Sequence, residues 1–196
     1  MTDSAARRRD DRRPGGPGGD RLPEGPRLRF ATWREDDLPL ARRLWGDADV
    51  MRFLTRAPLD DGAIRERLAR ERANLENLGF QYWPLFLKDG GAFAGCCGLK
   101  PCPYVETPEA PELELGFHLL PEAWGRGYAT EAATAVARVA FDRLDVARLY
   151  AGHHPQNRAS GAVLRKLGFE HVRDVLYEPT GLMHPLYLLE AARLAR

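Results

Sequence analysis

Apolar and polar positions along the chain repeat with two periods, one typical of strands and one typical of helices. Residues 28–33 and 112–119 alternate apolar and polar side chains, which predicts half-buried strands. Between residues 60 and 79 apolar side chains recur at helical spacing, and the segment ends in glycine. This pattern predicts an amphipathic helix with a glycine at its end.

The same two patterns predict the order β-α-α-β-β-β-α-β-α-β-β, with no internal repeat. A Gly-rich turn at 89–91 predicts a β-hairpin on either side of it. The predicted strands lie at 28–33, 82–88, 92–99, 112–119, 148–152, 169–177 and 186–189. The predicted helices lie within 36–46, 60–79, 129–144 and 157–168. We therefore expect an α/β fold.

Residues 1–27 differ from the rest in composition. They are rich in Arg, Gly and Pro, and Leu22 is the only large aliphatic side chain after Met1. Such a segment buries too little apolar surface to offset its ordering entropy. We expect a disordered tail at 1–27 and one domain at 28–196, since 196 residues with 44% hydrophobic side chains suit one core.

Charge and cysteine content exclude several classes of protein. The 29 basic and 28 acidic residues leave a net charge of +1, so a nucleic-acid partner is not expected. No apolar run approaches the roughly 20 residues of a membrane-spanning helix, and no secretory signal is evident. Three cysteines are an odd number, which argues against a disulfide scaffold. We expect a cytoplasmic protein without a membrane partner.

The segment Trp124-Gly125-Arg126-Gly127-Tyr128-Ala129 joins a predicted strand to a predicted helix. Glycines let a ligand approach the backbone, and the free N–H groups at a helix start attract anions such as a pyrophosphate. No Gly-Lys-Ser/Thr follows, so this is not a P-loop. A third glycine and a downstream acidic residue are missing, so it is not a dinucleotide fingerprint either.

In this loop the sequence resembles the GNAT superfamily of acyl-CoA-dependent N-acetyltransferases, whose pyrophosphate loop reads Gln/Arg-x-x-Gly-x-Gly/Ala. Gly127 and Ala129 match its last two fixed positions, and Trp124 replaces Gln or Arg. With the segments 114–117 and 157–169, the pattern resembles the branch that acetylates the N-termini of ribosomal proteins.

The resemblance implies a mixed, mainly antiparallel twisted sheet of about six to seven strands, splayed at the centre, with helices on both faces. It also implies acetyl transfer from acetyl-CoA to a primary amine, by direct attack in a ternary complex. The acceptor stays open between a protein N-terminus and a small molecule. Two alternatives remain, an antibiotic- or polyamine-modifying acetyltransferase and a non-catalytic acyl-CoA sensor or interaction module.

The resemblance also assigns residues to the co-substrate acetyl-CoA, with no metal. The backbone of the predicted strand 112–119 is expected to bind the pantetheine arm, and the loop is expected to bind the pyrophosphate. Asn157 is either a plain N-cap or a pantetheine contact. The expected co-substrate residues are Phe117, His118, Leu119, Trp124, Gly125, Arg126, Gly127, Tyr128, Ala129, Thr130 and Asn157.

Acyl transfer to an amine needs a sink for the proton of the amine and a proton for the leaving thiolate. Glu114 is our first candidate for the base and Glu112 our second, because both share one strand face and like charges raise one pKa. A base elsewhere, or a site that only aligns the amine, stays open. Ser160, one turn into a predicted helix, is the candidate donor to the thiolate.

The remaining reactive residue types favour structural roles. Cys96 and Cys97 point to opposite faces of a strand and no C-x2-C pair exists, so buried small side chains are expected rather than a metal site. The acceptor is expected between 33–79 and 177–185, where Trp45, Phe53, Trp83 and Tyr177 form either an aromatic slot or core. A homodimer is possible, because many relatives dimerise.

Overall fold

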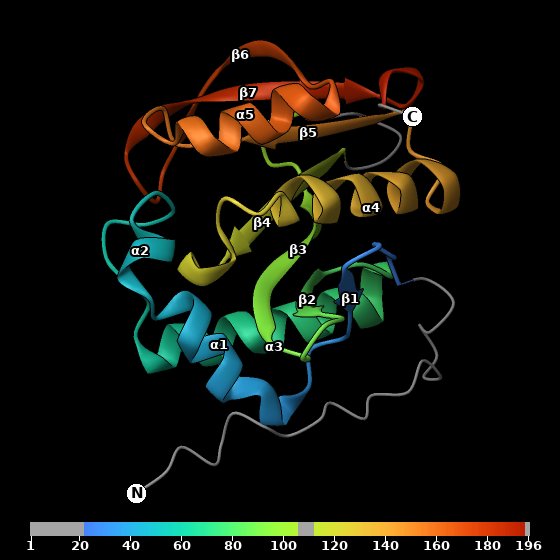
Figure 1. Ribbon diagram of the computed structural model, residues 1–196. Helices are drawn as coiled ribbons and strands as arrows, with labels where there is room; N and C mark the ends of the chain where they lie inside the picture. The colour runs from blue at the N-terminus through green and yellow to red at the C-terminus, as the bar shows by residue number, and fades with distance from the viewer. Residues whose placement is uncertain (1–21, 106–111, 195–196) are drawn as a thin grey trace, which may run out of the picture.

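The computed structural model describes residues 22–105 and 112–194, which form an α/β fold with one seven-stranded sheet (Figure 1). Its strands are β1 (Leu28–Phe30), β2 (Tyr82–Leu87), β3 (Phe93–Pro101), β4 (Leu113–Leu119), β5 (Arg148–Gly152), β6 (Glu170–Tyr177) and β7 (Leu182–Glu190). Its helices are α1 (Leu38–Trp45), α2 (Ala48–Met51), α3 (Asp61–Leu78), α4 (Tyr128–Arg143) and α5 (Arg158–Leu167).

The sheet is mixed, mainly antiparallel and splayed at its centre. Its order is β1-β2-β3-β4-β5-β7-β6, and only β4 and β5 run parallel. Those two strands pair at Leu113 with Leu149 and at Glu114 with Tyr150, and nowhere further along. From Leu115 onward the two strands diverge, which leaves one edge of β4 without a partner strand among the described residues. The splayed sheet expected from the resemblance is confirmed.

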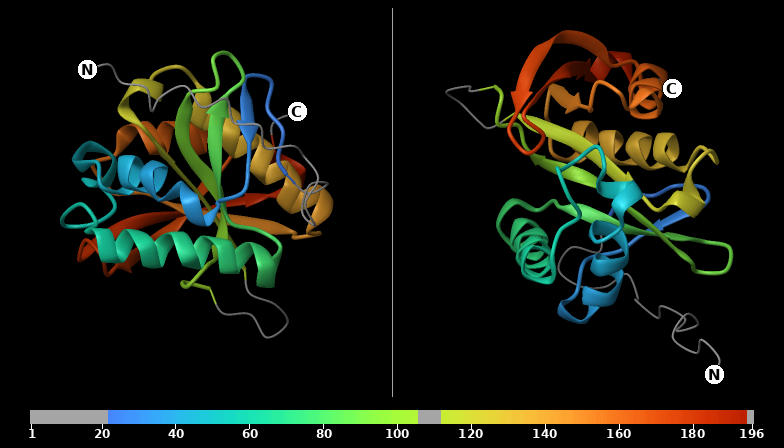
Figure 2. Two further views of the ribbon diagram at one scale, coloured as in Figure 1. Left: turned by 90° about the horizontal axis from the view of Figure 1, so that it is seen from below. Right: turned by 90° about the vertical axis from the view of Figure 1, so that its left-hand side faces the viewer.

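Helices cover both faces of the sheet, as expected (Figure 2). On one face, α4 and α5 pack on a large apolar core. The buried side chains of α4, most of them alanines, all belong to this core. On the other face, α1, α2 and α3 pack on a second core. Adjacent cysteines mark the two faces, since Cys97 lies in the first core and Cys96 in the second. All three cysteines are buried and free, as the sequence predicts.

Helices α3 and α5 begin with a side-chain cap and end at a glycine. Asp60 accepts a hydrogen bond from the Ala63 backbone at 2.8 Å, and α3 ends at Gly79 with a φ of 79°. Asn157 accepts from the Ser160 backbone at 3.1 Å at the start of α5. The sequence predicts the glycine at the end of α3 and the cap at Asn157.

The structure differs from the predictions at several places, and β1 is three residues shorter than predicted. The four-residue helix α2 is absent from the prediction, because a single turn shows no period. Strand β7 begins at Leu182, four residues before the predicted start. Residues 22–27, which the sequence analysis assigns to the tail, lie along α4, where the Arg27 backbone donates to Glu131 at 2.7 Å. Residues 1–21 lie outside the described residues.

None of the helices in the described part of the chain is both long enough and apolar enough to cross a membrane.

Candidate active site

A cavity of about 830 Å³ opens where β4 and β5 diverge, and α2, α3, α4, α5 and the β6–β7 hairpin enclose it. It collects most of the residues predicted for the site. Those that line it are Glu114, Phe117, His118, Leu119, Trp124, Gly125, Gly127, Tyr128, Ala129, Thr130, Asn157 and Ser160. Glu112 and Arg126 are not among its lining residues. Segments that are far apart in the sequence therefore meet in one place.

The loop before α4 leaves backbone donors free at one end of the cavity. Gly125 and Gly127 adopt left-handed φ values of 72° and 78°, which glycine tolerates best. Gly127 is the N-cap of α4, and no side chain caps the helix. The first-turn N–H groups of this 16-residue helix thus stay available to a ligand, with the positive end of the helix dipole behind them. This geometry fits a pyrophosphate.

Two contacts hold the loop in place. The Trp124 indole donates to the Leu119 carbonyl at 2.7 Å, which ties the loop to the end of β4. On the far side, Arg27 donates to Glu131 at 2.7 Å and to the Arg126 carbonyl at 3.0 Å. Trp124, which departs from the family pattern, therefore holds the loop against the end of β4. The contribution of Arg126 to the loop is its backbone carbonyl, which accepts a hydrogen bond from Arg27.

The structure separates the two carboxylates that the sequence places on one face. Glu114 lines the cavity and lies 3.1 Å from the ammonium of Lys100 on β3. Glu112 forms an ion pair with Arg148 outside the cavity lining. Burial raises the pKa of Glu114, and Lys100 partly opposes the shift. The predicted cause was the neighbouring charge of Glu112, so that explanation is wrong.

Asn157 and Ser160 lie on the opposite wall, at the start of α5. Asn157 is the N-cap of that helix, so the cap is confirmed, and the same side chain also lines the cavity. Ser160 lines the cavity one turn later. Both side chains face the gap between β4 and β5 from the β5 side.

Tyr82 is a cavity residue that sequence reasoning missed. It starts β2 opposite Gly98, and its ring crosses β3 to place the hydroxyl over Gly116 on β4, where a Cβ would lie only 2.2 Å from Oη. Tyr82 is 5% exposed. Burial and the nearby Glu114 charge raise the pKa of Tyr82 well above its usual value. The phenol is thus a neutral hydrogen-bond donor facing the cavity.

Arg67 on α3 is a second cavity residue that the sequence did not reveal. Its guanidinium stacks on Trp45, with 4.5 Å to the ring centroid, and lies 3.5 Å from His118 Nδ1 and 3.8 Å from Glu71 Oε1. Trp45 also donates to His118 at 3.4 Å. Burial, Arg67 and Lys100 lower the pKa of His118, so the imidazole is neutral. The His118 side chain therefore belongs to the α3 side of the cavity.

Aromatic and histidine side chains line the cavity beside α2 and the β6–β7 hairpin. Phe53 packs 5.1 Å from His154, which meets His184 at 5.3 Å, and His184 stacks on Tyr177 at 4.7 Å between ring centroids. Of the four aromatic residues proposed for a slot, Phe53 and Tyr177 line the cavity, whereas Trp45 and Trp83 are core residues.

Burial and the neighbouring His154 and His153 lower the pKa of His184 to about 4. Thr180 lies 2.9 Å from His184 Nε2, which gives the neutral ring a hydrogen-bond partner. Within residues 22–105 and 112–194, no group of three or more His, Cys, Asp or Glu side chains is arranged to hold a metal ion. His153, His154 and His184 all line the cavity.

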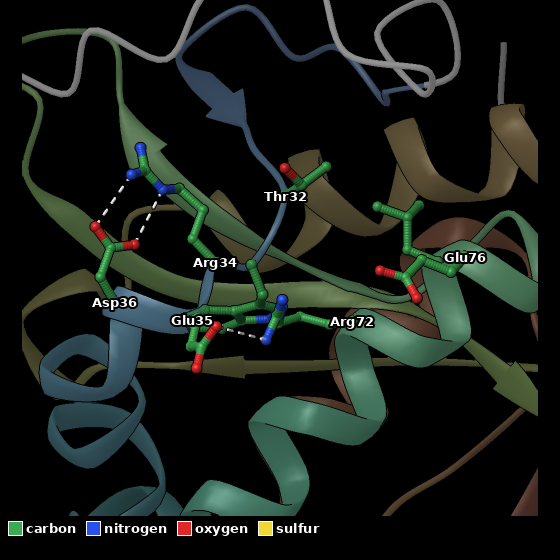
Figure 3. Close-up of a pocket in the computed structure, with 8 residues that line it drawn as sticks. Thr32, Arg34, Glu35, Asp36, Arg72 and Glu76 are labelled. Carbon is green, nitrogen blue, oxygen red and sulfur yellow. Dashed lines mark hydrogen bonds and ion pairs between the residues drawn. The ribbon is translucent and has the colours of Figure 1, made fainter.

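A second hollow lies between residues 32–36 and α3 (Figure 3). Arg34 pairs with Asp36 at 3.0 Å, and Arg72 pairs with Glu35 at 3.9 Å, so these charges satisfy one another. The hollow contains none of the residues predicted for the site. We assign the chemistry to the central cavity.

Comparison with known proteins agrees with this geometry. The family model described as "Acetyltransferase (GNAT) domain" matches residues 27–170, which include the loop, β4 and α5. A curated relative from Aspergillus fumigatus, FsC-acetyl coenzyme A-N(2)-transacetylase, is 33% identical over 151 residues. That alignment covers 74% of this chain and 63% of the relative, so the chain spans less than two thirds of that protein.

Solved structures share the fold over most of the chain. An acetyltransferase from Agrobacterium tumefaciens superposes with a TM-score of 0.69 and 26% identity, over 85% of this chain and 92% of the other. The ribosomal L7/L12 alpha-N-protein acetyltransferase RimL, solved with coenzyme A, gives a TM-score of 0.71 with 17% identity, over 86% and 97%. At 17% identity the second likeness shows the fold alone.

Proposed function

Because this chain belongs to the GNAT family of acetyl-CoA-dependent N-acetyltransferases, we propose that it acetylates a primary amine by direct attack while both substrates are bound. One observation carries the proposal. A single cavity joins the uncapped N-terminus of α4 to the buried carboxylate Glu114, across the splay between β4 and β5. Holding both reactants in one place removes the need for a covalent enzyme intermediate.

The residues present fit acetyl-CoA. The amides at the start of α4 bind the pyrophosphate, with Gly125 and Gly127 leaving room for it. The unpaired edge of β4 at Phe117–Leu119 binds the pantetheine arm, and Asn157 faces the arm from α5. Acetyl-CoA supplies an activated acetyl group and a thiolate leaving group.

Glu114 accepts the proton of the amine. Its raised pKa makes it a better base than an exposed glutamate, and burial in a low-dielectric wall strengthens its attraction for the ammonium form of the acceptor. Lys100 keeps the carboxylate ionised and fixed on β4. Glu112 is tied to Arg148 and has no part in this step.

Two hydroxyl groups face the centre of the cavity from opposite walls. Tyr82 donates a hydrogen bond to the negative charge that develops at the reacting carbonyl, because its high pKa keeps it protonated. Ser160 relays a proton to the leaving thiolate and takes one from solvent water in return, so the serine stays neutral, and Glu114 later releases its proton to solvent. The N–C bond forms as the C–S bond breaks, and the amine proton goes to Glu114.

The named activities of relatives support an amine acceptor and leave its identity open. One relative is named as an N(2)-transacetylase and one structural neighbour as a ribosomal-protein acetyltransferase. A protein N-terminus and a small-molecule amine are both compatible with these names.

The proposal is tested by incubating the purified protein with acetyl-CoA and a broad panel of amines, and by following release of free thiol. We expect amine-dependent release that saturates in both substrates and needs both present at once. Release without amine that leaves an acetylated enzyme would contradict direct attack. Absence of both release and acetyl-CoA binding would contradict the function itself.

A further inference from the structure

The α3 wall of the cavity carries an arginine whose buried Nε lacks a hydrogen-bond partner and whose other contacts are long. Arg67 has a side chain only 18% exposed, and its Nε is buried with no hydrogen-bond partner among the described residues. Its nearest described acceptors are His118 at 3.5 Å and Glu71 at 3.8 Å. A guanidinium has five N–H donors in a planar fork, and burying them unpaired is costly. A ligand with a planar anionic group would satisfy them.

Neither neighbour of Arg67 can substitute for such a ligand. Oε2 of Glu71 already accepts the Tyr82 backbone N–H at 2.8 Å, and burial raises the pKa of this carboxyl. Nδ1 of His118, which faces Arg67, also accepts a hydrogen bond from the Trp45 indole N–H. Stacking on Trp45 fixes the plane of the Arg67 guanidinium. The N–H groups along the edge of that plane are therefore oriented before a ligand binds.

The charges of the whole lining favour an anionic group on the acceptor. Its basic side chains are Arg52, Arg67, Arg70, Lys100 and Lys166, and its acidic side chains are Asp49, Glu71 and Glu114. Arg52 lies over Trp124 in the pyrophosphate loop, 5.7 Å from the ring centroid, and so belongs to the acetyl-CoA end. Arg67 and Arg70 lie on α3, away from that loop. A polycation such as a polyamine would be repelled by the positive charges of these two arginines.

The loop after α2 also meets the β6–β7 turn beside the cavity. The guanidinium of Arg56, in the loop after α2, lies where a Cβ on Gly181 would be 2.8 Å from it, so this loop rests on the turn between β6 and β7 (Figure 1). Phe53 packs on His154 beside it. Contact between these two segments narrows access from this side, which favours a small acceptor over an extended polypeptide.

We propose that the acceptor is a small primary amine that carries a carboxylate, and that Arg67 binds this carboxylate while Glu114 faces the amine. Both side chains flank Tyr82, with Arg67 5.8 Å from the centroid of its ring. The acceptor is therefore held by opposite charges at its two ends. This inference rests on the proposed function and specifies its substrate class.

The test compares matched acceptors. Each α-, β- or γ-amino acid is assayed beside its carboxamide and its decarboxylated amine, with spermidine and short peptides in the same panel. We expect kcat/KM to be about 10- to 100-fold higher for the acid than for its carboxamide, the size of a charge-assisted hydrogen-bonded pair. A carboxamide makes the neighbouring amine less basic, so intrinsic reactivity alone would favour the amide.

Arg67→Met keeps the packing on Trp45 and removes the charge. We expect it to raise KM for the acids about 10- to 100-fold, to abolish the difference between acid and carboxamide, and to leave acetyl-CoA affinity unchanged. Arg65→Met, an exposed position on the same helix, is the matched control and should change none of these. Arg67→Lys keeps the charge without the planar fork and should give an intermediate KM.

A measurement on the wild type covers the case in which Arg67→Met does not fold. Carboxylic acids that lack the amine should inhibit competitively against the acceptor, and their carboxamides should not. A preference for carboxamides, peptides or spermidine would overturn the proposal, as would a variant that keeps the acid preference. If acetyl-CoA binds and amines without a carboxylate react equally well, only this inference fails. If no amine reacts and acetyl-CoA does not bind, the proposed function fails.

Discussion

The hydroxyl oxygen of Tyr82 lies directly over Gly116, so close that a Cβ on that glycine would be 2.2 Å from it. Gly116 leaves room for the ring of Tyr82 to reach β4. Gly98, its partner in the register of β3 and β4, leaves room for the backbone of Gln81 and Tyr82. Two positions without side chains thus admit one phenol to the centre of the cavity.

Gly116→Ala should therefore displace Tyr82. Overpacking of this kind destabilises a core by about 1–3 kcal/mol, and we expect a loss of that size in the free energy of unfolding, measured by urea denaturation. Tyr82→Phe in the same chain should restore part of the loss, because the closest clashing atom is then gone. Gly152→Ala, whose nearest contact would be at 3.5 Å, is the control. Equal losses for the two glycine variants would contradict the account.

Tyr82→Phe alone should lower kcat and leave both KM values nearly unchanged. The phenol is proposed to stabilise charge that exists only during the reaction, and removal of one such donor costs about 10²- to 10³-fold in kcat in the strongest known cases. We expect an effect up to this size in steady-state assays. An unchanged kcat would show that the hydroxyl has no part in the reaction.

Glu114→Gln and Glu112→Gln should differ sharply. Loss of a general base costs about 10²- to 10⁴-fold, so we expect this fall in kcat for Glu114→Gln only. Because burial raises the pKa of Glu114, the wild-type rate should fall with decreasing pH from a point above the ordinary glutamate range. The measurement is the pH–rate profile of the wild type and of both variants. An equal fall in kcat for the two variants, or an unchanged kcat for Glu114→Gln, would argue against Glu114 as the base.

His184 should make the protein sensitive to acid. Its folded-state pKa is about 4 and its ordinary value is 6.5, so between these values the unfolded chain binds a proton that the folded chain does not. The contribution of the neutral ring to stability is present at high pH and is lost as the pH falls from about 6.5 towards 4. The groups around it are His153, His154, Tyr177 and Thr180.

We therefore expect the wild type to lose more unfolding free energy than His184→Gln between pH 7.5 and pH 5, measured by urea denaturation. Thr180→Val, which removes the hydrogen-bond partner and keeps the ring, should retain the wild-type slope with pH. Parallel pH profiles for the wild type and His184→Gln would contradict the burial of a neutral His184.

Most of the fold was predictable from the sequence because its signals are local. The bounds of β5 and the glycine ends of α3 and α5 follow from alternation and capping within a few residues. The splay between β4 and β5 could be expected only through the family resemblance, since nothing in either strand alone indicates where they separate. The turn α2 is too short to show a period.

The candidate site was predictable where its chemistry lies in one continuous segment. The loop at 124–130 and the strand that contains Glu114 met this condition, and they line the cavity. Arg67 and Tyr82 did not, because an arginine on a helix and a tyrosine in a strand have the same local pattern whether they face solvent, core or ligand. Their positions depend on the packing of α3 against β2, β3 and β4, and on glycines in two different strands.

Binding of acetyl-CoA to the loop before α4 is the most direct test of the central claim. It is measured by calorimetric titration of the wild type, of Gly127→Glu, and of Gly90→Glu as control. Gly90 has a similar φ of 74° and lies in an open turn of the β2–β3 hairpin, so its variant carries the same backbone strain away from the cavity. We predict that the wild type and Gly90→Glu bind acetyl-CoA. Gly127→Glu should abolish binding, because a residue with a Cβ strains the left-handed turn that presents the α4 amides to the pyrophosphate. Equal binding by all three proteins, or by none, would contradict the placement of acetyl-CoA in this cavity.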